Sequence, residues 1–170
     1  MKKLFPTFPE ANNYRGKSQR AKLKPEDWDV LRKDVLRRDN HKCLFCGFKA
    51  DEWQTINYLD GDTGNNAKSN LATVCPMCNL ILNAPLGCKV EGIVELYESS
   101  RYNQNEIVRI TRHMRSGGKS DAEIIRHLGL KGRVQFKMDR DYLKGLFAFV
   151  TSWKGSWGQV EDALAYGYCH

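Results

Sequence analysis

Four of the six cysteines form two Cys-x-x-Cys pairs, a spacing typical of metal binding. Cys43 pairs with Cys46 and Cys75 with Cys78, and 28 residues lie between the two pairs. Each turn of this kind directs two thiolates at one point, so two turns together supply the four ligands of a tetrahedral zinc ion. We therefore predict one structural Zn²⁺, whose four thiolate ligands leave no coordination position open for catalysis.

The stretch between the pairs predicts a hairpin that leads into a helix. Residues 53–59 alternate well enough for a strand, and residues 60–66 contain the turn residues Asp-Gly-Asp and Gly-Asn-Asn. Residues 71–74 form the predicted returning strand, and Pro76 suits the start of a helix that continues to residue 82. The expected arrangement around the metal is strand, turn, strand and helix.

Helices and one further strand are predicted on either side of this hairpin. Pro25 suits the first position of a helix over 25–38. Residues 92–97 predict a short strand, and capping-box patterns at Asn103 and Ser120 open two more helices. A third helical stretch is predicted over about 132–151 from the spacing of Val134, Phe136, Met138, Tyr142, Leu143, Leu146, Phe147 and Val150.

The net charge of +7 is unevenly distributed along the chain. Residues 1–42 contain 12 lysines and arginines against 6 acidic residues, and residues 101–144 contain 11 against 5. Residues 43–100, which hold the cysteine pairs, contain only 3 against 7. Four thiolates on one zinc ion add about two negative charges to this part. Nucleic-acid binding centred on it would therefore meet phosphate repulsion.

The length of 170 residues suits one domain, or a small metal-stapled module with a helical one. No run approaches the roughly 18 apolar residues of a membrane span. No apolar stretch follows the two lysines at the start, so we expect no secretory signal. Without a secretory signal, and with Cys-x-x-Cys spacing, we expect the cysteines to bind zinc in a reducing compartment and not to form disulfides. Cys88 and Cys169 lie outside the predicted zinc site.

The order of the motifs resembles the HNH endonuclease family in its zinc-ribbon form. The resemblance covers residues 36–83, through Arg-Asp-x3-Cys-x2-Cys-Gly, Leu-Asp-Gly-Asp, Asn-Asn-x3-Asn-Leu and Cys-x2-Cys. It implies a ββα finger that, in the family, carries a catalytic divalent ion and a general base. The positions of those groups hold Asn57, Tyr58 and Asn79 here, and only Asn70 matches the family.

These substitutions predict a finger without nuclease activity. A general base needs a pKa near the working pH, which histidine supplies, whereas an unperturbed tyrosine titrates at about 10. Asn57 and Asn79 offer neutral carbonyl oxygens, but a hydrolytic Mg²⁺ site normally includes a carboxylate. Asp60 and Asp62 lie nearby in the sequence, which leaves a divergent HNH nuclease with relocated ligands as an alternative.

A narrower resemblance is to the IcmJ/DotN family of the Dot/Icm type IVB secretion system. It rests on Arg38–Phe48, Leu59–Asp62, Asn65-Asn66 and Ser69–Cys75, with weaker similarity onward to residue 150. It implies a non-enzymatic scaffold or adaptor of a secretion or conjugation coupling complex. Such a subunit would bind the C-terminal tail of the coupling ATPase (DotL) and other subunits. The implied location is the bacterial cytoplasm, peripheral to the inner membrane through the complex.

The predicted fold class is therefore α+β, with a degenerate HNH-like ββα finger and a four-cysteine zinc ribbon, followed by a small helical region. Four segments are expected. They are a basic irregular arm over 1–24, the HNH-like zinc-ribbon module over 25–100, a helical region packed on it over 101–150, and an aromatic, glycine-containing tail over 151–170.

A DNA-binding role is a second alternative. Ser120–Leu130 resembles the first helix and turn of a helix-turn-helix. Phosphate contacts would come from basic residues in the region 119–144, namely Arg126, Lys131, Arg133, Lys137 and Arg140. The same residues also suit the solvated face of a capped helix, so the pattern predicts either role.

Overall fold

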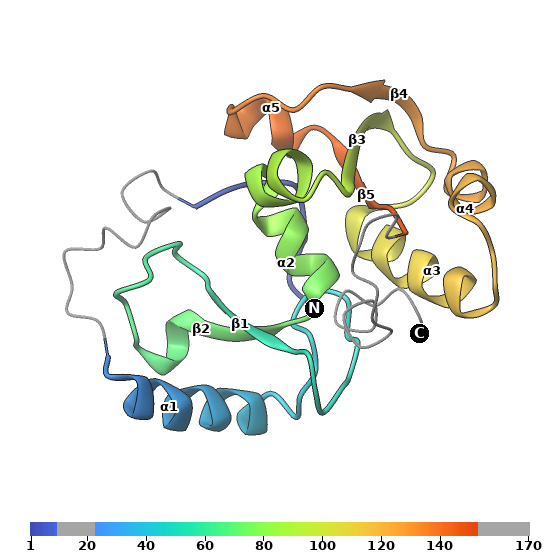
Figure 1. Cartoon of the computed structure of the whole chain (residues 1–170). Helices are drawn as coiled ribbons and strands as arrows, with labels where there is room; N and C mark the ends of the chain where they lie inside the picture. The colour runs from blue at the N-terminus through green and yellow to red at the C-terminus, as the bar shows by residue number, and fades with distance from the viewer. Residues whose placement is uncertain (10–22, 153–170) are drawn as a thin grey trace.

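The computed structural model describes residues 1–9 and 23–152, and these form the α+β fold predicted from the sequence (Figure 1). The helices are α1 (Pro25–Arg38), α2 (Pro76–Leu82), α3 (Gln104–Ser116), α4 (Asp121–Leu128) and α5 (Arg140–Lys144). The strands are β1 (Thr55–Tyr58), β2 (Leu71–Val74), β3 (Val94–Ser99), β4 (Lys131–Val134) and β5 (Phe147–Val150). Two short helical turns are η1 (Lys68–Asn70) and η2 (Leu86–Val90).

The predicted hairpin between the cysteine pairs and the helix that follows it are confirmed. Strands β1 and β2 are antiparallel, with Thr55 opposite Val74 and Tyr58 opposite Leu71, and α2 follows directly. We call β1, β2, α2 and the loop over residues 39–54 the finger. Helix α1 packs against the hairpin, which lies between it and the rest of the molecule in Figure 1. The buried side chains of this contact are Val35, Leu36, Ile56 and Leu71.

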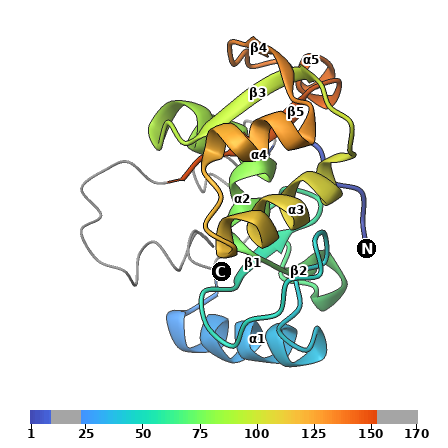
Figure 2. The ribbon, with the colours of Figure 1, turned by 90° about the vertical axis from the view of Figure 1, so that its right-hand side faces the viewer.

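The remaining strands form an antiparallel sheet in the order β4-β3-β5. One face, which includes Leu96 and Ala148, packs against α2 in the largest buried cluster. Tyr97 and Phe149 on the other face pack against residues of α3 and α4. Figure 2 shows these two helices beside the sheet. Because β3 pairs with strands from beyond residue 100, this sheet crosses the predicted boundary between the 25–100 and 101–150 segments.

Helices α3 and α4 begin at the predicted capping boxes. The Asn103 side chain accepts a hydrogen bond from the Glu106 N–H, while Glu106 accepts from the Asn103 N–H. Ser120 and Glu123 repeat this exchange at the start of α4. These local bonds satisfy donors that would otherwise lack partners, so the sequence alone determines where both helices begin.

The prediction of a helix over 132–151 is wrong. The chain there forms strand β4, the short helix α5 and strand β5. Four consecutive residues of β5, Phe147 to Val150, are covered on both faces, and a short apolar run of that kind fits a buried strand as well as a helix. Pairing with β3 makes these residues a strand. On the outer edge of β5, the Gln104 side chain of α3 hydrogen-bonds both the N–H and the carbonyl of Ala148.

The first nine residues have no regular secondary structure but cross the molecule and contribute to its core. Leu4 is buried, and its N–H donates to the Asn105 side chain across 3.0 Å. The Thr7 N–H donates to the carbonyl of Ile81 in α2. The rest of the predicted basic arm, residues 10–22, and residues 153–170 of the predicted tail lie outside the described residues.

Candidate metal centre

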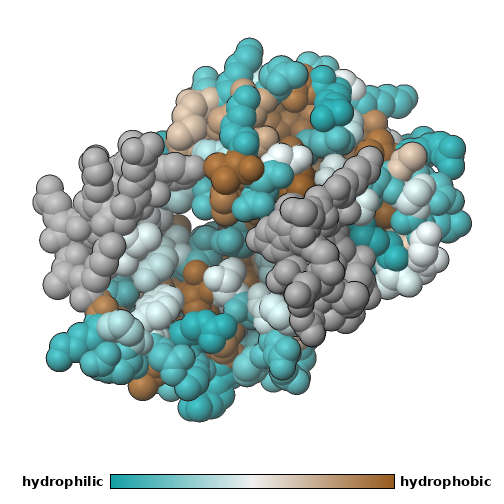
Figure 3. Space-filling model, viewed as in Figure 1, coloured by the Kyte–Doolittle hydropathy of each residue, from teal (hydrophilic) through white to brown (hydrophobic). Residues whose placement is uncertain are grey.

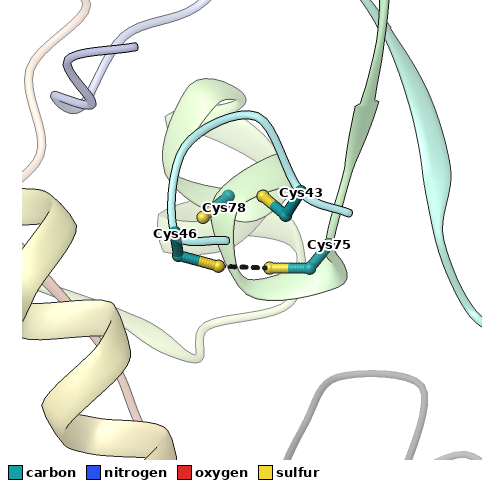
Figure 4. A group of neighbouring side chains, drawn as sticks. All are labelled: Cys43, Cys46, Cys75 and Cys78. Atoms are coloured by element: carbon teal, nitrogen blue, oxygen red, sulfur yellow. Dashed lines mark hydrogen bonds between the residues drawn. The ribbon is translucent and has the colours of Figure 1, made fainter. Parts of the chain in front are cut away.

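The four cysteines of the two pairs meet at one point inside the finger. Cys43 and Cys46 lie on the loop after α1, Cys75 directly precedes α2 and Cys78 lies in its first turn (Figure 4). All four are buried, their sulfur atoms lie within 4.8 Å of one another, and those of Cys46 and Cys75 are 3.6 Å apart. Ligands on a tetrahedral ion with metal–sulfur bonds of about 2.3 Å would be about 3.8 Å apart. The cluster therefore fits one metal ion.

Local backbone structure sets the positions of the sulfur atoms. The Gly47 N–H donates to the carbonyl of Cys43, and Gly47 has a φ of +76°, a conformation that glycine adopts without steric cost. The Cys43 N–H donates to the carbonyl of Phe48, which closes the first turn. Pro76 at the start of α2 places Cys78 on the helix one turn beyond Cys75.

The pKa values of the thiols are displaced in opposite directions. Burial raises the pKa of Cys75 and of Cys78 well above the ordinary value, while the Cys46 thiol and the other two cluster thiols lower the pKa of Cys43. Four buried thiolates cannot coexist at this spacing without a cation. A bound divalent ion supplies the charge that allows all four to be deprotonated.

Arg112 of α3 lies against the cluster, and sequence reasoning missed it. Its Nη2 donates to the sulfur of Cys75 across 3.4 Å, and its guanidinium carbon lies 3.7 Å from the centre of the Phe48 ring. The side chain is buried, and its Nε and Nη1 have no hydrogen-bond partner among the described residues. A buried guanidinium requires a countercharge, which thiolates on a metal would provide. Arg112 follows buried Val108 by four residues, so helical periodicity could have placed it on the inner face.

The residues that correspond to the HNH catalytic positions lie on β1 and α2. Asn57 and Tyr58 lie on β1, and Asn79 follows Cys78 on α2. The Tyr58 ring stacks on Trp28 of α1 at 5.9 Å between centroids, and its hydroxyl donates to Asn66 across 3.3 Å. Burial, helped by the Asp62 charge, raises the pKa of Tyr58. This shift moves the hydroxyl further from general-base chemistry.

The Asp-Gly-Asp turn after β1 hydrogen-bonds to itself. Oδ1 of Asp60 accepts from the Asp62 N–H and from Nδ2 of Asn70, while Oδ2 accepts from Nδ2 of Asn65. Oδ1 of the Asn70 side chain in turn accepts from the Asp60 N–H. Asn70, the residue that matches the HNH pattern, therefore holds the shape of this turn.

The basic residues of the DNA-binding alternative lie on three elements and on the segment between β4 and α5. Arg126 is on α4, Lys131 and Arg133 are on β4, Lys137 follows β4 and Arg140 begins α5. The helix-turn-helix interpretation is wrong, because α4 is followed by a strand of the sheet and no second helix packs after the turn within residues 23–152.

Three of these side chains contact other parts of the protein. Arg133 pairs with Glu95 at 3.1 Å, and the Lys137 amine lies over the Tyr142 ring. Arg140 donates to the carbonyl of Phe8. Arg126 and Lys131 are exposed. Of the five residues, Arg126 and Lys131 are thus the two whose side chains make no hydrogen bond, ion pair or ring contact within the described part of the chain.

The fold and site together define an α+β protein with a four-cysteine finger. No known family model matches the chain. It is 50% identical over 44 residues to the type 4 apparatus protein DotN of Legionella pneumophila, which covers 26% of this chain and 21% of DotN. It is also 33% identical over 81 residues to the CRISPR-associated endonuclease Cas9 of Corynebacterium diphtheriae, which covers 45% of this chain and 7% of Cas9. The matches thus span about a fifth of DotN and a small part of Cas9.

None of the helices in residues 1–9 and 23–152 combines the length and the apolar character that a membrane crossing requires.

Proposed function

We propose that this chain is a non-enzymatic, zinc-binding scaffold subunit of a type IVB secretion or conjugation coupling complex. In this proposal it binds the C-terminal tail of the coupling ATPase and contacts other subunits of the complex. It works in the bacterial cytoplasm, peripheral to the inner membrane. The observation that carries the proposal is the 50% identity to the type 4 apparatus protein DotN over 44 residues.

The metal centre supports a structural role for the finger. Four sulfur ligands favour zinc among the common metals and fill a tetrahedral site completely. The cluster also belongs to the largest core, where Cys43, Cys46, Cys75 and Cys78 pack with residues of the sheet. An ion bound there would hold the finger against the second half of the molecule, and the surrounding surfaces would remain available for partners.

The non-enzymatic part of the proposal rests on what stands at the positions of HNH chemistry. Tyr58 packs on Trp28 and has a raised pKa, and Asn57 and Asn79 carry no charge. Asp60 is used within its own turn. The similarity to an endonuclease makes a nicking test necessary. Supercoiled plasmid should remain intact with Mg²⁺, Mn²⁺ or Zn²⁺, and nicking that disappears in Tyr58→Ala would overturn this part.

The partner is tested by co-expression of the full chain with the cytoplasmic C-terminal tail of the coupling ATPase from the same genome. Size-exclusion chromatography should show one complex, and the purified chain should contain one zinc per molecule by elemental analysis. A tail of the same composition in scrambled order is the control. Separate elution of the chain and the native tail would refute the proposed partner, whatever the metal content.

A further inference from the structure

Three surface hollows adjoin one another, and basic side chains lie where they meet. The first, of about 260 Å³, lies between the N-terminal residues, the end of β1 and the start of α5. The second and third, each of about 330 Å³, lie beside α3. Lys2 and Lys3 line both the first and the second hollow, and Arg109 lines both the second and the third. With Arg140 in the first hollow, we call Lys2, Lys3, Arg109 and Arg140 the basic track.

Aromatic side chains line the same hollows. Phe5, Phe8 and Phe45 line the first hollow together with Tyr58, and Phe48 lines the third. A ligand in these hollows therefore meets positive charge at the junctions and apolar surface between them. That alternation suits a chain in which acidic and apolar groups are interspersed.

The backbone that carries the two lysines is fixed on both sides. The Lys2 N–H donates to the carbonyl of Leu44 across 3.1 Å, and its own carbonyl accepts from Nδ2 of Asn105 across 2.7 Å. Oδ1 of Asn105 accepts from the Leu4 N–H. The side chains of Lys2 and Lys3 are exposed. Their backbone is thus already ordered, which lowers the entropy lost when a ligand binds.

Three of the four residues of the basic track keep their charge unpaired within the described part of the chain. Lys2, Lys3 and Arg109 form no ion pair with any acidic residue in 1–9 or 23–152. Asp60 is the acidic residue of the first hollow, and its carboxylate accepts hydrogen bonds within its own turn. The track therefore presents a net positive surface.

We propose that the basic track is the docking surface for an extended acidic segment of a partner protein, whose carboxylates meet Lys2, Lys3, Arg109 and Arg140. This proposal rests on the proposed function and identifies the surface and the chemistry by which the ATPase tail would bind. A peptide fits better than a nucleic acid, because a phosphate chain carries charge at every unit. Part of that charge would face the apolar hollows and the acidic 43–100 segment.

The test compares two doubly charge-reversed variants of the full chain. Lys3→Glu/Arg109→Glu changes the track at both of its junctions. Lys89→Glu/Lys131→Glu makes the same change in net charge at exposed lysines that line none of the three hollows. Fluorescence anisotropy measures the Kd for the labelled ATPase tail at about 50 and 300 mM salt. Melting temperature and zinc content show that each variant is folded.

We expect the track variant to bind the tail at least about tenfold more weakly than the wild type, and the control variant to stay within about twofold. The wild-type Kd should rise with salt. Equal binding by both variants would overturn the docking surface and leave the proposed function intact. No binding by the wild type would instead refute the partner. The same measurement is made with a labelled DNA duplex. If the wild type binds the duplex and only the track variant loses that binding, while tail binding is unchanged, the track binds nucleic acid and the proposal is overturned.

Discussion

The Arg112 guanidinium donates a hydrogen bond to the Cys75 sulfur across 3.4 Å and thereby joins α3 to the finger. The guanidinium carbon also lies over the Phe48 ring, 3.7 Å from its centre. Four thiolates on one divalent ion would carry about two net negative charges, and Arg112 is placed to offset part of that charge inside the protein. The four-cysteine cluster thus contacts a residue 34 positions beyond its last cysteine, from the second half of the chain.

Replacing Arg112 should weaken metal retention. We expect Arg112→Met to bind zinc about 10- to 100-fold more weakly, because the hydrogen bond to Cys75 and the nearby positive charge are both lost. A competition titration with a coloured chelator measures the affinity. The matched control is Arg109→Met, on the exposed side of the same helix, and it should bind zinc like the wild type. The same loss in both variants, or in neither, would contradict the role of Arg112.

Removing one ligand should release the metal and destabilise the fold. We expect Cys75→Ser to contain less than one zinc per chain and to melt at a lower temperature, because the cluster belongs to the largest buried core. Strong chelators should affect the wild type in the same way. Cys88→Ser is the control, since Cys88 lies outside the four-sulfur cluster. Elemental analysis and thermal unfolding provide the two measurements, and full zinc content in Cys75→Ser would argue against the assigned ligand set.

The Asp39 carboxylate should contribute stability over most of the pH range. It accepts hydrogen bonds from Arg38 and from the Thr73 N–H, which connect the end of α1 to β2. Burial alone would raise the pKa of Asp39, but Arg38 and Thr73 outweigh it and lower the pKa below the ordinary 3.8. Because the pKa of Asp39 is lower in the folded state than in the unfolded state, its contribution to stability is fully present at pH values above the unfolded-state pKa. The contribution is lost as the pH falls through the folded-state pKa.

We therefore expect Asp39→Asn to lower the free energy of unfolding by about 1–3 kcal/mol at pH 7. The difference from the wild type should stay constant down to pH 5, because neither state of Asp39 titrates in that range. Urea denaturation measures it, with the exposed Asp51→Asn as the control. A difference that already disappears between pH 7 and 5 would show that another group is responsible.

Tyr58 should behave as a packing residue. We expect Tyr58→Phe to cost less than about 1 kcal/mol, because only the long hydroxyl contact with Asn66 is lost. Tyr58→Ala should cost about 2–4 kcal/mol, because the stacking on Trp28 is lost as well. Denaturant unfolding of the two variants separates these contributions. If both substitutions destabilise the protein equally, the hydroxyl and not the ring accounts for the contribution of Tyr58 to stability.

Local signals predicted much of the finger and several helix boundaries. Pro25 and Pro76 mark the starts of α1 and α2, and Asn103 and Ser120 cap α3 and α4. These features depend on bonds within a few residues, so the sequence contains the whole signal. The two Cys-x-x-Cys turns are local in the same sense. Their spacing predicted which four sulfur atoms come together.

The tertiary structure decided what depends on partners distant in the chain. Residues 147–150 became a strand because β3 offers its edge, and the apolar run alone fits either secondary structure. Arg112 reaches the cysteines only because α3 packs beside the finger. Lys2 and Lys3 come near Arg109 because Asn105 binds the N-terminal backbone. Spacing in the sequence determined which four cysteines come together. Long-range packing decided which charges lie around them, because the position of a buried or clustered charge depends on its neighbours in space.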